Sequence, residues 1–139
     1  MIQRVSHGSV WVLDMDRAKA FYTDKLGFEL RNDLNVGGFR WLTVGPVGQP
    51  DFELILMPVG ASPMMDKATA EQLASLVAKG VLGPGVLATA DCRRTYEELK
   101  ARGVEFRSPP EERPYGVEAM MKDDSGNWFS LTERRPFKA

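Results

Sequence analysis

Along residues 5–13 one set of side chains, Val5, Ser9, Trp11 and Leu13, alternates with another, Gly8, Val10 and Val12, and this period of two, with its β-branched content, predicts a strand. The period then lengthens, because the apolar residues of 18–26 fall on one face of a helix. Asp14 can cap the start of that helix, and Gly27 can end it. Extended segments separated by glycine- and proline-rich turns follow, at 28–36, 39–44 and 52–57. The first part of the chain therefore predicts the order β-α-β-β-β.

The second half of the chain repeats this order. A strand-like run at 86–90 leads to a second possible cap at Asp91, a helix with Tyr96 and Leu99 on one face, and a stop at Gly103. Three further strands are expected, near 104–107, 117–121 and 128–132. The stretch DMDRAKAFYTDKLGFELR aligns with DCRRTYEELKARGVEFR, with one residue of gap, so the chain carries two copies of one supersecondary unit.

Between the two copies, the stretch 66–80 has leucine and valine in helical register and predicts a short connecting helix. We expect one domain over residues 1–139, with a first module at 1–60, a connecting segment at 61–82 and a second module at 83–139. The proline-rich stretch 108–114 is expected to be an exposed loop, because proline cannot donate a hydrogen bond within a central strand.

Composition limits the classes of partner. The chain has 139 residues, 43% of them hydrophobic, which suits a single globular domain. Its 18 basic and 19 acidic residues are well mixed, so neither nucleic acid nor a membrane surface is an expected partner. Cys92 is the single cysteine and is interpreted as a structural thiol, and no apolar run resembles a signal peptide or a membrane span. We therefore expect a cytoplasmic protein.

Three motifs carry a resemblance to a known family. They are V-x-V-L-D-M-D-R-A-K-A-F-Y-x-D-x-L-G-F-E at 10–29, R-P-Y-G-V-E at 113–118 and D-D-S-G-N-W-F at 123–129. Together they resemble the vicinal oxygen chelate superfamily, which includes glyoxalase I, bleomycin resistance proteins and extradiol dioxygenases. The resemblance implies an α+β fold in which two βαβββ modules form an open, curled mixed sheet around a cavity. It also implies a homodimer, and it leaves open whether the paired modules belong to one chain or to two.

The resemblance further implies positions for metal ligands. In the metal enzymes of the superfamily each module supplies two ligands, which here fall on His7 and Glu53 in the first module and on Gly85 and Ser130 in the second. Glycine and serine are not usual ligands, so we expect no tightly bound metal; a weak divalent metal at His7 and Glu53 is the alternative. Without the resemblance, His7 is better interpreted as a partly buried imidazole that hydrogen-bonds a carboxylate and performs no chemistry.

Strand alternation predicts the rest of the cavity wall. The expected catalytic pair is His7 and Glu53, and the expected ligand-binding residues are Trp11, Ile55, Met57, Leu87, Thr89, Tyr115, Trp128 and Ser130. Alternatively, Tyr115 is part of the bend that enters a strand and not of the cavity wall. This mixture of aromatic area and few polar groups predicts a protein that binds a small aromatic or amphipathic molecule. The alternative is an enzyme of the lyase or dioxygenase-like kind, using either a weak divalent metal or His7 and Glu53 as an acid-base pair.

Overall fold

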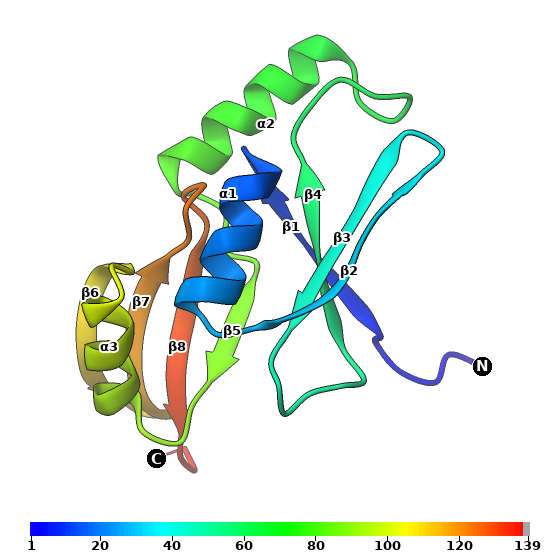
Figure 1. Cartoon of the computed structure of the whole chain (residues 1–139). Coiled ribbons are helices and arrows are strands. Elements are labelled where there is room, and N and C mark those ends of the chain that lie inside the picture. The colour runs from blue at the N-terminus through cyan, green and yellow to red at the C-terminus, as the bar shows by residue number, and fades with distance from the viewer. Residues whose placement is uncertain (138–139) are drawn as a thin grey trace.

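The computed structural model describes residues 1–137, and it contains eight strands and three α-helices (Figure 1). The strands are β1 (His7–Val12), β2 (Glu29–Val36), β3 (Phe39–Gly45), β4 (Glu53–Pro58), β5 (Gly85–Ala88), β6 (Glu105–Arg113), β7 (Gly116–Lys122) and β8 (Trp128–Arg134). The helices are α1 (Met15–Ala20), which continues as the π-helical turn η1 (Phe21–Lys25), α2 (Lys67–Lys79) and α3 (Cys92–Ala101).

The strands form two four-stranded mixed sheets with the same topology. Their orders are β1-β4-β3-β2 and β5-β8-β7-β6. In each sheet the first strand pairs in parallel with the last strand of its unit, and the other pairs are antiparallel. Neither sheet closes into a barrel, and the predicted α+β fold with a repeated β-α-β-β-β order is confirmed.

Aspartate residues begin all three α-helices. The side chains of Asp14, Asp66 and Asp91 each accept a hydrogen bond from the backbone N–H three residues later, at 2.9, 2.7 and 3.0 Å. This contact satisfies one of the N–H groups that a helix start leaves without a partner. At the other end of α2, Gly80 adopts φ 75°, a left-handed conformation that favours glycine. The three helix starts lie where the sequence predicts them.

The expected exposed loop at 108–114 is wrong, because most of it belongs to β6. Pro109 and Pro110 lie inside this strand, which is the outermost strand of the second sheet. An edge strand leaves one row of backbone groups unpaired, so a residue without an N–H is tolerated there. The register of β6 against β7 also shifts on either side of Ser108, which accommodates the proline pair.

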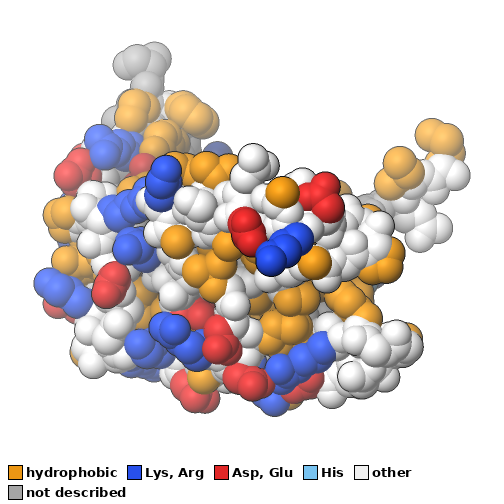
Figure 2. All heavy atoms as spheres, turned by 90° about the horizontal axis from the view of Figure 1, so that it is seen from above, with side chains coloured by type: hydrophobic (Ala, Val, Ile, Leu, Met, Phe, Trp, Pro, Cys, Tyr) orange, Lys and Arg blue, Asp and Glu red, His pale blue; other side chains and the backbone are white. Residues whose placement is uncertain are grey.

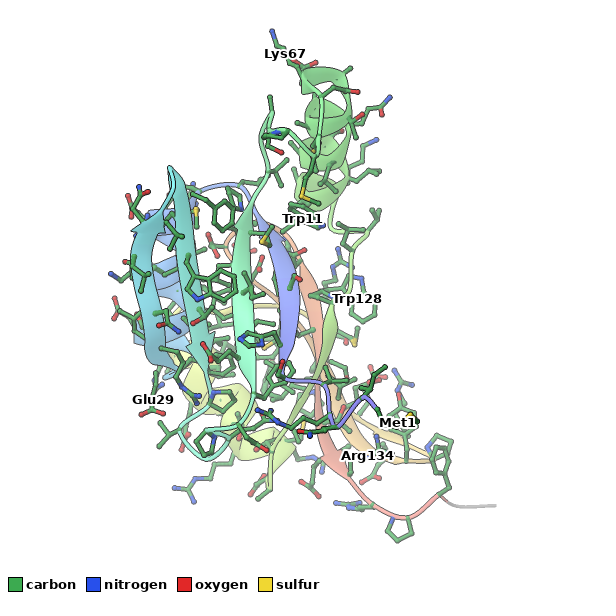
Figure 3. The ribbon with its side chains drawn as sticks, turned by 90° about the vertical axis from the view of Figure 1, so that its right-hand side faces the viewer. Met1, Trp11, Glu29, Lys67, Trp128 and Arg134 are labelled. Carbon is green, nitrogen blue, oxygen red and sulfur yellow. The ribbon has the colours of Figure 1, made fainter. Side chains whose placement is uncertain are left out.

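The hydrophobic core lies in the angle between the two sheets, where α1 and α3 pack (Figures 1 and 3). The core is continuous from one sheet to the other, because Tyr22 of η1 packs against Phe129 of β8 with ring centroids 6.3 Å apart. The Tyr22 hydroxyl donates to the Asp123 carboxylate at 2.7 Å, and the Asn127 amide donates to the Trp11 carbonyl at 2.8 Å. Both sheets therefore turn their helix-covered faces inward and their other faces outward.

Charged side chains of both signs are dispersed over the surface. Figure 2 shows them interspersed with apolar side chains on the face that carries α2. Among residues 1–137, no helix is long and apolar enough to cross a membrane.

Candidate functional site

His7 and Glu53 lie side by side on the outward face of the first sheet. The parallel register of β1 and β4 pairs these two residues directly. His7 Nε2 lies 3.6 Å from Glu53 Oε2, and His7 Nδ1 lies 2.8 Å from Ser6 Oγ. The two residues that the sequence analysis expects to act as a pair are therefore neighbours. Both ring nitrogens of His7 therefore face a polar partner, which fixes the direction of the ring.

Neutral donors hold the Glu53 carboxylate in place. Thr43 Oγ1 donates to Glu53 Oε1 at 2.6 Å, and Asn32 Nδ2 donates to the same oxygen at 2.9 Å. The hydrogen bond from Thr43 is the main cause that lowers the pKa of Glu53, followed by the bond from Asn32 and the proximity of His7. Glu53 is therefore ionised at neutral pH, and among residues 1–137 its second oxygen, Oε2, has His7 as its polar neighbour.

Apolar side chains surround this polar cluster. The register places Trp11, Ile55 and Met57 on the same face as His7, while Leu56 on the opposite face is fully buried. The predicted face assignment of β1 and β4 is therefore confirmed.

Trp41 was not predicted as a site residue, although its ring centroid lies 6.0 Å from that of His7. Alternation within 39–44 provides a signal for it, because Leu42 and Val44 are fully buried and Trp41 and Thr43, which alternate with them, point to the other face. Three apolar side chains further along the same face are exposed, namely Leu34, Val36 and Phe39.

The outward face of the second sheet carries a second polar cluster. Ser130 Oγ donates to Glu118 Oε2 at 2.5 Å, and the Tyr115 hydroxyl donates to Glu118 Oε1 at 2.6 Å. Tyr115 itself lies in the turn before β7, as the bend interpretation predicts. Trp128 shares this face, and its ring lies against Gly83 so closely that a Cβ at residue 83 would come within 2.1 Å of it. Trp11 and Trp128 thus belong to different sheets (Figure 3).

Three predicted positions on β5 and just after it lie on the wrong face. The register pairs Gly85 with Phe129 and Leu87 with Leu131, and Leu87 packs against the hydrophobic core. Thr89 also points to the helix side, where its hydroxyl lies 2.7 Å from that of Thr95 in α3. The motif spacing placed the outward-facing positions of β5 one residue away from their true positions. Val86 is the residue paired with Ser130 on the outward face, and it is 59% exposed.

The donor set does not fit a catalytic divalent metal. No group of three or more His, Cys, Asp or Glu side chains within residues 1–137 is arranged to hold one. Both acceptor positions of Glu53 Oε1 are taken by Thr43 and Asn32, and Val86 and Ser130 supply no ligand from the second module. Glu118 belongs to the other sheet and does not form a group of three ligands with His7 and Glu53 within residues 1–137. One chain therefore offers only His7 and Glu53 as neighbouring metal ligands at this site.

A cleft within one chain lies away from the predicted catalytic pair. It has a volume of about 360 Å³ and is bounded by α1, the end of α2 and the turn between β7 and β8. Its charged side chains include Arg17, Lys25, Lys122 and Asp124, and none of the predicted site residues lines it. The two outward faces are open surfaces in the single chain rather than walls of one closed pocket.

Comparisons with known proteins point to one superfamily. Residues 4–131 match the family model described as Glyoxalase/Bleomycin resistance protein/Dioxygenase superfamily. The crystal structure of UcmS2 is 53% identical with a TM-score of 0.91, covering 96% of this chain and 99% of that one. TnmS3, described as an antibiotic binding protein from Streptomyces sp. CB03234, is 32% identical with a TM-score of 0.76, covering 96% and 98%. YetH of Bacillus subtilis (strain 168) is 33% identical over 134 residues, which are 96% of this chain and 100% of YetH.

Proposed function

The chain belongs to the glyoxalase/bleomycin resistance protein/dioxygenase superfamily, and from this premise we propose that it binds an aromatic or amphipathic organic molecule without metal chemistry. One observation carries the proposal: the outward face of the first sheet surrounds the His7 and Glu53 cluster with Trp11, Trp41 and Ile55. Such a combination of stacking area and few oriented polar groups suits a drug-sized ligand. The similarity to a protein described as antibiotic binding supports the same class of function.

A second copy of the chain completes the site in this proposal. Leu34 is 47% exposed and Val36 is 57% exposed on the first outward face, and Val86 is 59% exposed on the second. Exposed apolar surface of this extent is typical of a protein interface. The two outward faces diverge within one chain, so a cavity walled by both requires the first face of one protomer to meet the second face of its partner.

Binding is tested with 2-naphthol and 7-hydroxyflavone as probes. We expect both to bind in equilibrium dialysis, and 7-hydroxyflavone to quench tryptophan fluorescence. Trp11→Ala and Trp41→Ala should weaken binding by about tenfold each, because each removes a stacking face. Val47→Ala is the matched control, since this exposed valine lies in the turn before β4. EDTA should leave binding unchanged; binding that appears only after Zn²⁺ or another divalent metal is added would reverse the proposal.

The homodimer is tested by sedimentation at micromolar concentration. We expect twice the chain mass of 15.5 kDa. Val86→Asp should yield a monomer that no longer binds 2-naphthol, whereas Val47→Asp, 67% exposed in the wild type, should remain a dimer. A monomeric wild type that still binds the probe would remove the shared cavity and leave a site on one face.

A second candidate function is metal-free acid-base catalysis. The observation that favours it is the orientation of His7 by Ser6 and Glu53, at 2.8 and 3.6 Å. Slow turnover of a bound molecule that is lost in both His7→Ala and Glu53→Gln would support it. A cytoplasmic location, and the absence of nucleic-acid and membrane partners, remain predictions from composition.

A further inference from the structure

The hydroxyl and amide donors of the two outward faces are almost all used within the protein. On the first face, Thr43 donates its hydroxyl proton to Glu53, and Asn32 donates both amide protons, one to Glu53 and one to Thr43. The indole N–H groups of Trp11 and Trp41 and the hydroxyl of Ser9 are the donors that have no partner within residues 1–137. Glu53 is the carboxylate beside His7 on this face, and Arg31, which pairs with Glu29 at 3.5 Å, is a cation whose charge also acts on it.

On the second face the hydroxyl groups beside Glu118 are used in the same way, and Lys122, which is paired with Trp128, adds a cation to this face. Tyr115 and Ser130 both donate to Glu118, and Ser130 Oγ lies 2.5 Å from Thr132 Oγ1. Because Ser130 gives its single proton to Glu118, Thr132 must donate to Ser130. The hydroxyl protons of Tyr115, Ser130 and Thr132 are therefore all donated within the protein, and these hydrogen bonds end at the Glu118 carboxylate.

The Glu118 carboxylate keeps unused acceptor capacity. Each of its oxygens accepts one of these hydroxyl protons and can accept a second. Its side chain is 15% exposed, so water reaches it poorly. Arg113 Nε lies 3.7 Å away, but Nη2 of the same guanidinium lies 2.9 Å from Glu111, which shares the charge. A desolvated carboxylate with free lone pairs favours a hydrogen-bond donor beside it and disfavours an anion.

We propose that the ligand is an aromatic molecule that carries a hydrogen-bond donor, a hydroxyl or a protonated amine, and that Glu118 is the residue that selects it. This inference rests on the proposed function and names the ligand class of the same site. It applies to the cavity shared between two copies, which is walled by the second face of one protomer, with Glu118, and the first face of its partner. A carboxylate or phosphate group beside Glu118 would meet a like charge.

The test uses four naphthalenes of equal ring area in equilibrium dialysis with the full chain at pH 7. They are 2-naphthol, 2-naphthylmethylamine, 2-methoxynaphthalene, which has no donor, and sodium 2-naphthoate. We expect the naphthol and the amine to bind at least about tenfold more tightly than the methoxy compound, and the naphthoate to bind most weakly. The naphthol and the amine are the two forms of the donor, and the tighter of them identifies which one the site takes.

Two variants separate Glu118 from a general effect of charge. Glu118→Gln keeps the shape and one acceptor oxygen, so it should abolish the preference for the amine and raise naphthoate binding by about tenfold. Glu97→Gln removes the same charge from an exposed position on α3 and should change nothing. Circular dichroism establishes that both variants fold. If Glu118→Gln does not fold, the four wild-type affinities still decide the ligand class.

The two proposals fail in different ways. If none of the four naphthalenes binds, the small-molecule function itself is overturned. If all four bind equally, or the naphthoate binds most tightly, the function stands and the donor requirement is overturned. If the donor preference persists in folded Glu118→Gln, another residue selects the ligand.

Discussion

Removal of the Tyr22 hydroxyl tests the contact that joins the two halves of the core. Tyr22 is fully buried in η1, and its hydroxyl donates to Asp123 Oδ2 at 2.7 Å across 101 residues of sequence. Tyr22→Phe keeps the ring and its packing against Phe129, so it leaves no cavity larger than one oxygen atom. The change in the free energy of unfolding therefore reports the hydrogen bond alone.

The magnitude follows from what Asp123 keeps. Its Oδ1 accepts three backbone N–H groups, at Ser125, Gly126 and Asn127, each at 2.9 Å, and Oδ2 also accepts the Asn127 amide at 2.9 Å. The carboxylate thus stays partnered when the hydroxyl is lost, which avoids the full cost of an orphaned buried charge. A hydrogen bond to a charged group contributes about 1.5–3 kcal/mol, so we expect Tyr22→Phe to cost about 2 kcal/mol.

Urea unfolding at one fixed protein concentration measures this cost. With a slope of about 2 kcal/mol per molar urea, the midpoint should fall by about 1 M while the slope stays constant. Tyr96→Phe is the matched control, because Tyr96 is half-buried on α3 with no hydrogen bond from its hydroxyl within residues 1–137. A loss below about 0.5 kcal/mol for Tyr22→Phe, or an equal loss in both variants, would refute the reasoning.

The pH dependence gives an independent readout of the same contact. Burial, and then the charge of Asp123, raise the pKa of Tyr22 well above its usual value. The neutral phenol is therefore favoured in the folded state, and its stabilising contribution is fully present below about pH 10, the pKa of an unfolded tyrosine. Stability should fall as the pH rises above about 10, and this fall should be smaller in Tyr22→Phe.

Two further substitutions test neighbouring features. Burial and the charge of Asp123 raise the pKa of Asp124 to about 6, so the stability of the wild type should fall as the pH rises from about 4 to about 6. Partial exposure of this carboxyl group reduces the effect. Urea unfolding should therefore show that Asp124→Asn gains about 1 kcal/mol of stability at pH 7 and nothing at pH 3.5. Gly83→Ala should lower the free energy of unfolding by about 1–3 kcal/mol and shift the tryptophan emission, because the new Cβ would lie 2.1 Å from the Trp128 ring. Gly60→Ala, which has open space around it, should change neither the stability nor the emission. Equal effects at both glycines would contradict the packing argument.

The sequence predicted well those features that depend on residues close together in the chain. Asp14, Asp66 and Asp91 each satisfy a backbone N–H at a helix start, which depends on residues only three positions apart. Alternation within β1 and β4 likewise predicted that His7 and Glu53 share a face, because a strand reverses its side chains at every residue. Neither inference requires knowledge of distant contacts.

The features that the sequence did not predict depend on register between distant strands. Leu87 and Thr89 were assigned to the outward face by counting back from the helix cap, but the pairing of β5 with β8 places Val86 there instead. A shift of one residue moves a whole strand to the other face, so a small error in spacing reverses every assignment. Trp41 was missed as a site residue because it lies on β3, which the ligand-position motif does not include. Glu118, on β7, was considered only as a residue that could complete a weak metal site.

Each module places a carboxylate on its outward face, but the two carboxylates lie on different strands of the repeated unit. In the first module the acid is Glu53, on the strand that pairs with β1. In the second module the corresponding position is Ser130, which has no charge, but the neighbouring strand supplies Glu118 and Ser130 donates to it at 2.5 Å. Judged by the motif positions alone, the second module has lost an acidic residue. In the folded sheet, however, Glu118 places a carboxylate next to Ser130. Each carboxylate accepts hydrogen bonds from neutral hydroxyl groups, Glu53 from Thr43 and Glu118 from Tyr115 and Ser130.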